Sequence, residues 1–138
     1  MAHDPDAIAK LFDASPFVAF LGLKVTEVEM DAGAVTMIMP MRPELARGGP
    51  IEGQFHGGAV ASLIDTVGDF AVALTAGAPV PTMNFRVDYL RPSGGAYLTG
   101  RAVTRRLGKS MAVVDIDVTD SQGRLTAVGR GTYSPKVG

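Results

Sequence analysis

The sequence predicts an α+β domain in which an antiparallel sheet wraps around one long central helix. Residues 56–76 carry apolar side chains at helical spacing, two strand-like segments precede them, and four follow. Turn sequences rich in glycine, serine and aspartate separate the later segments. The four later segments are 82–90, 96–106, 110–120 and 124–134. The order of helix, two strands, long helix and four strands indicates the α+β class.

Composition bounds the kind of protein before any motif is considered. A chain of 138 residues, 46% hydrophobic and 20% charged, suits one domain spanning residues 1–138. The net charge of −1 predicts no nucleic-acid partner, and no apolar run is long enough to predict a membrane span. Without cysteine there is no thiolate site, and two histidines predict no metal centre. The acidic start lacks the features of a signal peptide, so we expect a cytoplasmic protein.

The first third of the chain predicts a short helix, a hairpin and a long loop. Asp4 or Asp6 is placed to cap a helix within residues 4–20. The apolar face of that helix is expected to consist of Ile8, Leu11 and Phe12. Segments 23–30 and 34–40 flank a turn and predict the hairpin. Residues 42–54 then form a loop rich in glycine, proline and charge, and loops of this length are often functional.

The long helix is predicted to be covered on most of its sides. One face carries apolar residues at intervals of three and four: Val60, Leu63, Ile64, Val67, Phe70, Ala71 and Leu74. The opposite side is small rather than charged: Ala61, Gly68, Ala73 and Thr75. A surface helix would show a continuous polar face instead.

The polar residues of this helix raise a geometric question. His56 and Asp65 are nine residues apart, which places them about 13 Å apart on opposite faces of one helix. If both are functional, there are two sites or a second copy of the chain supplies one of them. Gly57 and Gly58 would expose N–H groups at the helix start, able to hold an oxyanion or simply to make a tight turn.

Two carboxylates lie one turn apart in the middle of the helix. Asp65 and Asp69 are spaced i, i+4 and therefore share a face. If that face is dehydrated, at least one of the two carboxyl groups should have a raised pKa. The alternative is that both lie on a narrow wetted strip and have no function.

At these residues the chain resembles a known family. "HGGAVASLID" at residues 56–65 resembles the signature of hotdog-fold acyl-CoA thioesterases of the PaaI-like, phenylacetic-acid-degradation group. "VDYLRP" at residues 87–92 and the pattern D-x-x-G-R-L-x-A-x-G at residues 120–129 are also similar to that family. The resemblance covers nearly the whole chain and implies a hotdog fold.

The resemblance implies a reaction and a set of catalytic residues. The reaction is hydrolysis of an acyl-CoA to a free acid and CoA, with CoA as part of the substrate and no cofactor. The active site would lie at a dimer interface, in a homodimer or a dimer of dimers. Asp65 would be the nucleophile or the general base, and the Gly57 N–H would polarise the thioester carbonyl across the interface. His56 would help to fix that turn and the acyl end, and Thr82 would assist the water or the leaving thiolate.

The resemblance also implies substrate-binding residues. Arg91, Lys109 and Ser110 match positions near the phosphates or pantetheine of CoA, although each is also an ordinary residue for an exposed turn. Gly58 belongs to the same turn as the Gly57 N–H. The acyl group is expected to lie against Val60, Ile64 and Met83.

Two positions depart from the family pattern. Relatives carry Asn or Gln at the position of Pro50, and Gln54 or Glu52 is a possible substitute in this chain. Asp69 stands where some relatives have a neutral hydroxyl, and it could raise the pKa of Asp65 or bind a substrate hydroxyl. Two other functions stay open: a hotdog enoyl-CoA hydratase or dehydratase, and a non-catalytic acyl-CoA sensor.

Overall fold

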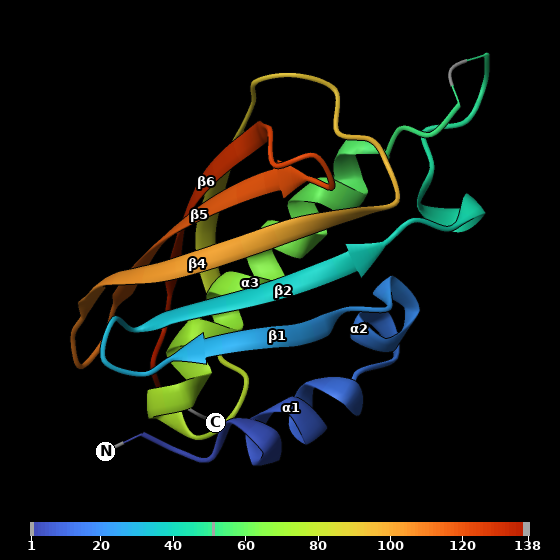
Figure 1. The fold of residues 1–138 in the computed structure, drawn as a ribbon. Helices are drawn as coiled ribbons and strands as arrows, with labels where there is room; N and C mark the ends of the chain where they lie inside the picture. Colours follow the sequence, from blue (N-terminus) through green and yellow to red (C-terminus); the bar gives the residue numbers. More distant parts are fainter. Residues whose placement is uncertain (1, 51, 137–138) are drawn as a thin grey trace.

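The computed structural model describes residues 2–50 and 52–136 and shows a curved sheet around one central helix (Figure 1). All strand pairs are antiparallel, in the order β1-β2-β4-β5-β6-β3. The strands are β1 (Lys24–Glu29), β2 (Ala34–Pro40), β3 (Thr82–Tyr89), β4 (Tyr97–Leu107), β5 (Ala112–Asp120) and β6 (Leu125–Tyr133). The helices are α1 (Pro5–Asp13), α2 (Pro16–Leu21) and α3 (Gly57–Ala76), with a 3₁₀ turn η1 (Pro43–Leu45). The predicted α+β class is confirmed.

The central helix α3 begins and ends where its sequence provides caps. His56 is the N-cap residue, and its Nδ1 accepts a hydrogen bond of 2.8 Å from the Gly58 N–H. Gly77 ends the helix in the left-handed conformation, with φ of 93°. By length and hydropathy alone α3 could cross a membrane, but two thirds of its apolar window is buried within this protein, as in the core helix of any folded domain.

The N-terminal segment forms two helices where one was predicted. Asp4 caps α1, and Ser15 caps α2 by accepting from the Val18 N–H, with Pro16 at the first helical position. The expected burial of Leu11 is wrong: its side chain is 46% exposed. Only Ile8 and Phe12 of α1 are buried, and the Phe12 ring lies 5.0 Å from that of Phe70 on α3.

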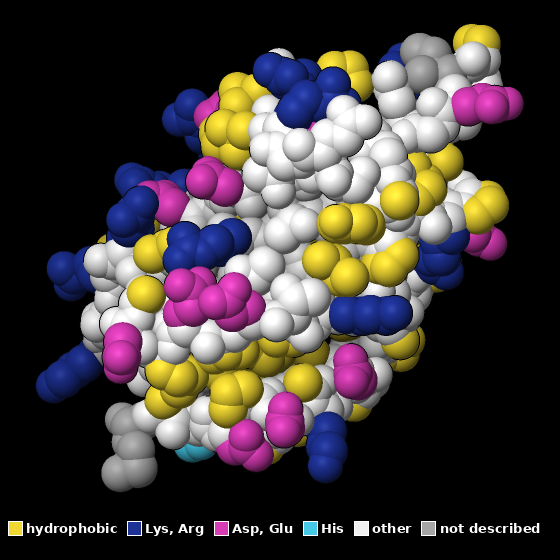
Figure 2. Space-filling model, viewed as in Figure 1, with side chains coloured by type: hydrophobic (Ala, Val, Ile, Leu, Met, Phe, Trp, Pro, Cys, Tyr) yellow, Lys and Arg dark blue, Asp and Glu magenta, His cyan; other side chains and the backbone are white. Residues whose placement is uncertain are grey.

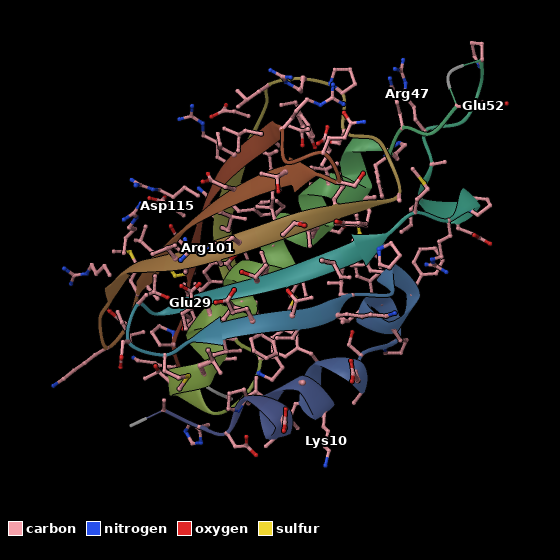
Figure 3. The ribbon with its side chains drawn as sticks, in the orientation of Figure 1. Lys10, Glu29, Arg47, Glu52, Arg101 and Asp115 are labelled. Atoms are coloured by element: carbon pink, nitrogen blue, oxygen red, sulfur yellow. The ribbon has the colours of Figure 1, made fainter. Side chains whose placement is uncertain are left out.

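The two faces of the sheet differ as the alternating sequence indicates. In β5, Ile116 and Val118 are buried against α3, whereas Asp115 and Asp117 lie on the outer face. Basic and acidic side chains are interspersed on the outer face (Figure 2). Figure 3 shows one such pair, Arg101 of β4 beside Glu29 of β1, whose atoms Nη2 and Oε2 are 3.0 Å apart.

The two edges of the sheet are not equivalent. The helix α1 lies beside the edge strand β1, and residues of both line one shallow cavity (Figure 1). At the other edge, β3 pairs with β6 alone among the described strands. Three large apolar side chains of β3 are exposed: Met83 by 59%, Phe85 by 37% and Tyr89 by 53%. An unpaired apolar edge of this kind is a surface suited to pairing with another strand.

Candidate active site

Asp65 lies near the middle of α3 and is held at two of its oxygen atoms. The Thr82 hydroxyl donates a hydrogen bond of 2.7 Å to Asp65 Oδ1. The Tyr133 hydroxyl donates to the main-chain oxygen of Asp65 at 3.0 Å. The structure thus brings together Asp65 and Thr82, which the sequence named as separate candidates. Tyr133 was not among the candidates, because nothing in the sequence links it to a residue 68 positions earlier.

A cavity of about 280 Å³ opens beside this carboxylate. It lies between α3, the N-terminal helices and β3, and its lining comprises Phe12, Ser15, Phe17, Val18, Ala61, Ser62, Asp65, Thr66, Asp69, Pro79 and Phe85. The expected lining by Val60 and Ile64 is wrong, since both are 1% exposed or less and pack toward the sheet. Met83 is exposed outside this lining. The cavity walls therefore combine aromatic and aliphatic side chains with three hydroxyl groups and the two carboxyl groups.

Asp69 lines the same cavity one helical turn beyond Asp65. Its Oδ1 accepts a hydrogen bond of 2.8 Å from the Val80 N–H, two residues before Thr82. Burial raises the pKa of Asp69 to about 7, the Val80 hydrogen bond acts against that rise, and the charge of Asp65 adds to it. The expectation of a raised pKa in this carboxyl pair is confirmed for Asp69.

The turn at the start of α3 is organised by three side chains. His56 Nδ1 is occupied as an acceptor, so a neutral His56 carries its proton on Nε2. The Tyr89 hydroxyl donates to the Gly57 oxygen at 2.6 Å, and the Ser62 hydroxyl donates to the Gly58 oxygen at 2.8 Å. The Gly58 N–H is engaged by His56, whereas the Gly57 N–H has no acceptor among the described residues.

Within one chain, the turn at the start of α3 lies far from Asp65. Gly57 and Asp65 are eight residues apart on the same helix, a separation of about 12 Å along its axis. The free Gly57 N–H and the carboxylate therefore lie at different levels of α3.

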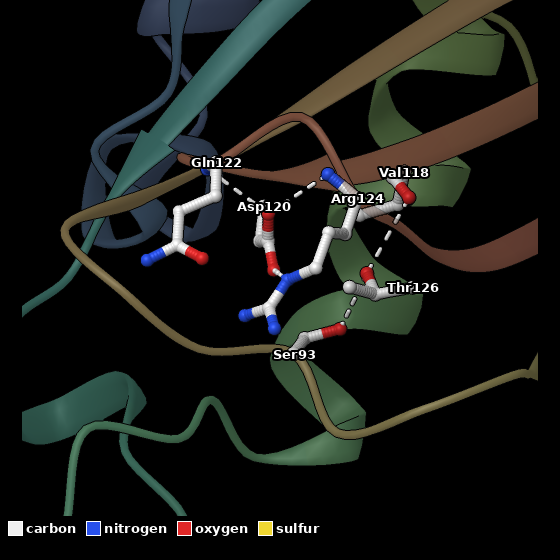
Figure 4. Close-up of polar contacts among 6 residues, drawn as sticks. All are labelled: Ser93, Val118, Asp120, Gln122, Arg124 and Thr126. Atoms are coloured by element: carbon white, nitrogen blue, oxygen red, sulfur yellow. Dashed lines mark hydrogen bonds and ion pairs between the residues drawn. The ribbon is translucent and has the colours of Figure 1, made fainter.

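A second, polar cleft of about 490 Å³ lies at the end of the sheet where β3 leads into β4. Gln54, Arg91 and Arg124 line it. Arg124 donates through Nε to Asp120 Oδ2 at 2.8 Å, and Asp120 Oδ1 accepts from the N–H groups of Gln122 and Arg124 (Figure 4). These hydrogen bonds, led by the Arg124 N–H, hold the pKa of Asp120 below its usual value. Arg124 was missed from the sequence, where it resembles any charged residue in a turn.

The other CoA-binding candidates do not reach this cleft within one chain. Lys109 and Ser110 lie in the turn after β4, whereas Arg91 lies before it. The strand between them has 11 residues, so the two groups are on the order of 30 Å apart. Within one chain, Arg91 and the pair Lys109 and Ser110 therefore lie at opposite ends of β4.

The loop around Pro50, the position at which the family pattern has Asn or Gln, extends beyond the sheet and the central helix (Figure 3). Arg47 and Glu52 lie on the segment that projects from the body of the protein (Figure 3). Gln54 lies in the polar cleft, and its Oε1 accepts from Arg47 Nη1 at 3.4 Å. Neither Glu52 nor Gln54 lines the cavity beside Asp65 of the same chain.

Comparison with known proteins identifies the family. The sequence model described as the thioesterase superfamily matches residues 52–127, more than half of the chain. The chain belongs to the thioesterase superfamily. Human acyl-coenzyme A thioesterase 13 is 32% identical over 130 residues, which cover 92% of this chain and 90% of the human protein.

Solved structures agree with this assignment. A protein described as belonging to the thioesterase superfamily superposes with a TM-score of 0.86 at 35% identity, covering 94% of this thioesterase and 96% of its own chain. The Escherichia coli PaaI protein, from the phenylacetic acid degradation operon, has the same fold, with a TM-score of 0.78, 24% identity and coverage of 96% and 92%. The predicted hotdog fold, the PaaI-like resemblance and the thioesterase class are confirmed.

No metal centre is evident in the described part of this thioesterase. Residues 2–50 and 52–136 contain no group of three or more His, Asp or Glu side chains suited to holding a metal ion.

Proposed function

We propose that this thioesterase hydrolyses acyl-CoA esters with Asp65 as the reacting acid. The observation that carries the proposal is the carboxylate of Asp65, fixed by Thr82 at the wall of a cavity lined in part by aromatic and aliphatic side chains. The Thr82 hydroxyl occupies Oδ1, which leaves Oδ2 for the reacting group. Such a carboxylate either removes a proton from water or attacks the carbonyl carbon itself. If water is the nucleophile, its oxygen forms the C–O bond, the C–S bond breaks, and the proton taken by Asp65 passes to the CoA thiolate. If Asp65 is the nucleophile, the C–S bond breaks to give an acyl anhydride. Water then hydrolyses that anhydride, which releases the free acid, regenerates the carboxylate and supplies the proton for the thiolate.

The carbonyl oxygen needs a hydrogen-bond donor, and the free Gly57 N–H is suited to that role. It lies at the positive end of the α3 dipole, where negative charge on the carbonyl oxygen would be stabilised. Tyr89 and His56 hold the surrounding turn. Because one chain separates Gly57 from Asp65, we propose that the donor comes from a second copy of this chain.

The exposed edge of β3 supports a dimer of that kind. Pairing β3 with β3 of a second copy would satisfy its unpaired N–H and C=O groups and cover Met83, Phe85 and Tyr89. Two-fold symmetry would then place the two α3 helices side by side and antiparallel. The start of one α3 would lie near the middle of the other, where Asp65 is.

The polar cleft is suited to the phosphate groups of CoA. Arg91 supplies positive charge, and Gln54 supplies an amide in the same cleft. Arg124 can add its Nη groups, because its ion pair with Asp120 uses Nε. Lys109 and Ser110 lie at the far end of β4, so we propose that they contact a CoA whose thioester is bound by a different copy. Asp69 would face the acyl group, together with Phe17 and Phe85.

The first test is thiol release from aryl, short, medium and long aliphatic acyl-CoAs. Wild type should turn over at least one ester, and Asp65→Asn should abolish that turnover while folding and assembling normally. Asp117→Asn is the matched control, because it removes a carboxylate from the exposed outer face. A near wild-type rate for Asp65→Asn would refute the assignment. Tight binding of acyl-CoA without turnover, or hydration of an enoyl-CoA, would instead support the sensor or hydratase function.

A second test addresses the shared site. Gly57→Pro removes the N–H at the first position of a helix, where proline is well accepted. A Cβ at this position would lie 3.4 Å from the Tyr89 hydroxyl oxygen, an ordinary contact distance. Mixed dimers of Asp65→Asn and Gly57→Pro chains should recover one working site in two, although each parent is inactive. Failure of folded mixed dimers to recover any activity would contradict a site built from two chains.

A further inference from the structure

Tyr133 is a fully buried residue for which the proposed reaction has no role. Its side chain is 0% exposed, at the end of β6. Its hydroxyl reaches the main-chain oxygen of Asp65 at 3.0 Å. In an α-helix that oxygen already accepts the N–H four residues on, so the tyrosine adds a second donor to the same carbonyl.

Two glycines provide the space that this ring requires. A Cβ atom at Gly68 of α3 would lie 2.2 Å from the Tyr133 hydroxyl oxygen. A Cβ at Gly131 of β6 would lie 2.5 Å from the same atom. Glycine weakens both a helix interior and a strand interior. At Gly68 and Gly131, this local cost is accepted in exchange for the space that the Tyr133 ring requires.

Tyr133 and Thr82 form a directly opposed pair across the sheet. They are Cα partners in the register of β6 and β3, and both side chains point to α3. Thr82 holds the side chain of Asp65 through Oδ1, and Tyr133 holds its main chain through the carbonyl oxygen. This opposed pair of residues therefore contacts both the backbone and the carboxylate of Asp65.

We propose that Tyr133 is a positioning residue for the reaction at Asp65. Together with Thr82, it fixes the distance between the sheet and the turn of α3 that carries Asp65. This inference rests on the proposed function of Asp65. Burial, with the nearby charges of Asp65 and Asp69, raises the pKa of the Tyr133 hydroxyl above its usual value, so it remains a donor. Because Tyr133 is fully buried, it does not touch the substrate.

The test is Tyr133→Phe, which keeps the ring and removes the hydroxyl. We expect kcat to fall about tenfold with KM changed less than twofold, since a small displacement of a reacting group has a large effect on rate. Thr126→Val is the matched control. Thr126 is also 0% exposed on β6, and its hydroxyl bonds Ser93 and the Val118 carbonyl at the opposite end of the strand (Figure 4). Thr126→Val should lose stability without losing kcat.

A double-mutant cycle separates positioning from a general loss of stability. Tyr133→Phe and Thr82→Val should combine non-additively in kcat, because both act through Asp65. Gly68→Ala provides an independent variant that displaces the hydroxyl while keeping the tyrosine, and it should lower kcat similarly. A wild-type kcat for Tyr133→Phe, additive effects, or an equal fall for Thr126→Val would each overturn the inference. Asp65→Asn, measured alongside, tests the proposed function separately. If Asp65→Asn keeps the wild-type rate, both proposals fail. If Asp65→Asn is inactive, the proposed function holds and the results for the Tyr133 variants decide the inference about Tyr133 alone.

Discussion

Replacing Asp69 with asparagine should make the protein more stable at alkaline pH and leave it nearly unchanged at acidic pH. Asparagine keeps an oxygen that can accept the Val80 N–H, so the contact between α3 and the start of β3 is retained. What it removes is an ionisable group whose charged form is disfavoured by burial beside Asp65.

The size of the effect follows from the shift in pKa. The pKa of Asp69 is 3.8 in its ordinary state and about 7 in the folded protein. Each unit corresponds to about 1.4 kcal/mol, so the shift is equivalent to about 4 kcal/mol. The folded state binds the proton more tightly than the unfolded state. The stabilising contribution is therefore complete below about pH 4 and is lost as pH rises to about 7.

The assay is urea unfolding of wild type and Asp69→Asn at fixed protein concentration from pH 4 to pH 9. Their free energies of unfolding should be similar near pH 4 and diverge by a few kcal/mol in favour of Asp69→Asn by pH 8. Asp117→Asn, on the outer face, should show no such divergence. A constant difference between wild type and Asp69→Asn across this range would refute the reasoning, because it would mean that Asp69 does not titrate between pH 4 and pH 7.

Two further predictions follow from close contacts and from the exposed sheet edge. Gly68→Ala should lower the free energy of unfolding by about 1–3 kcal/mol. The reason is that the overlap of the added methyl group with Tyr133 outweighs the gain in helix propensity of about 1 kcal/mol. An unchanged or raised midpoint of unfolding in urea would contradict this packing argument. Met83→Lys should shift a dimer toward monomer in sedimentation and reduce turnover with it, since it places a charge on the exposed edge of β3. Unaltered association would show that this edge is not the interface.

The positions that sequence patterns could not place are those that depend on distant pairing. Asp65 and Thr82 were both recognised, but their contact depends on how β3 lies against α3. Val60 and Ile64 were expected at the acyl group, yet they fill the core because the sheet covers that side of the helix. An apolar helical face is equally consistent with a sheet and with a ligand, so periodicity cannot choose between them.

The sequence by itself determined the order of the strands and of the central helix, and it named the candidate site residues. The period of residues 57–76, the caps at His56 and Gly77 and the alternation in β5 are local properties, and local side-chain geometry is sufficient to specify them. The tertiary structure alone decided which elements meet. It placed Tyr133 beneath Asp65, gathered Arg91 and Arg124 into one cleft, and separated Arg91 from Lys109 by the length of β4. Those relations arise from the order of strands in the sheet, which is set by the packing of the whole core and by no single segment.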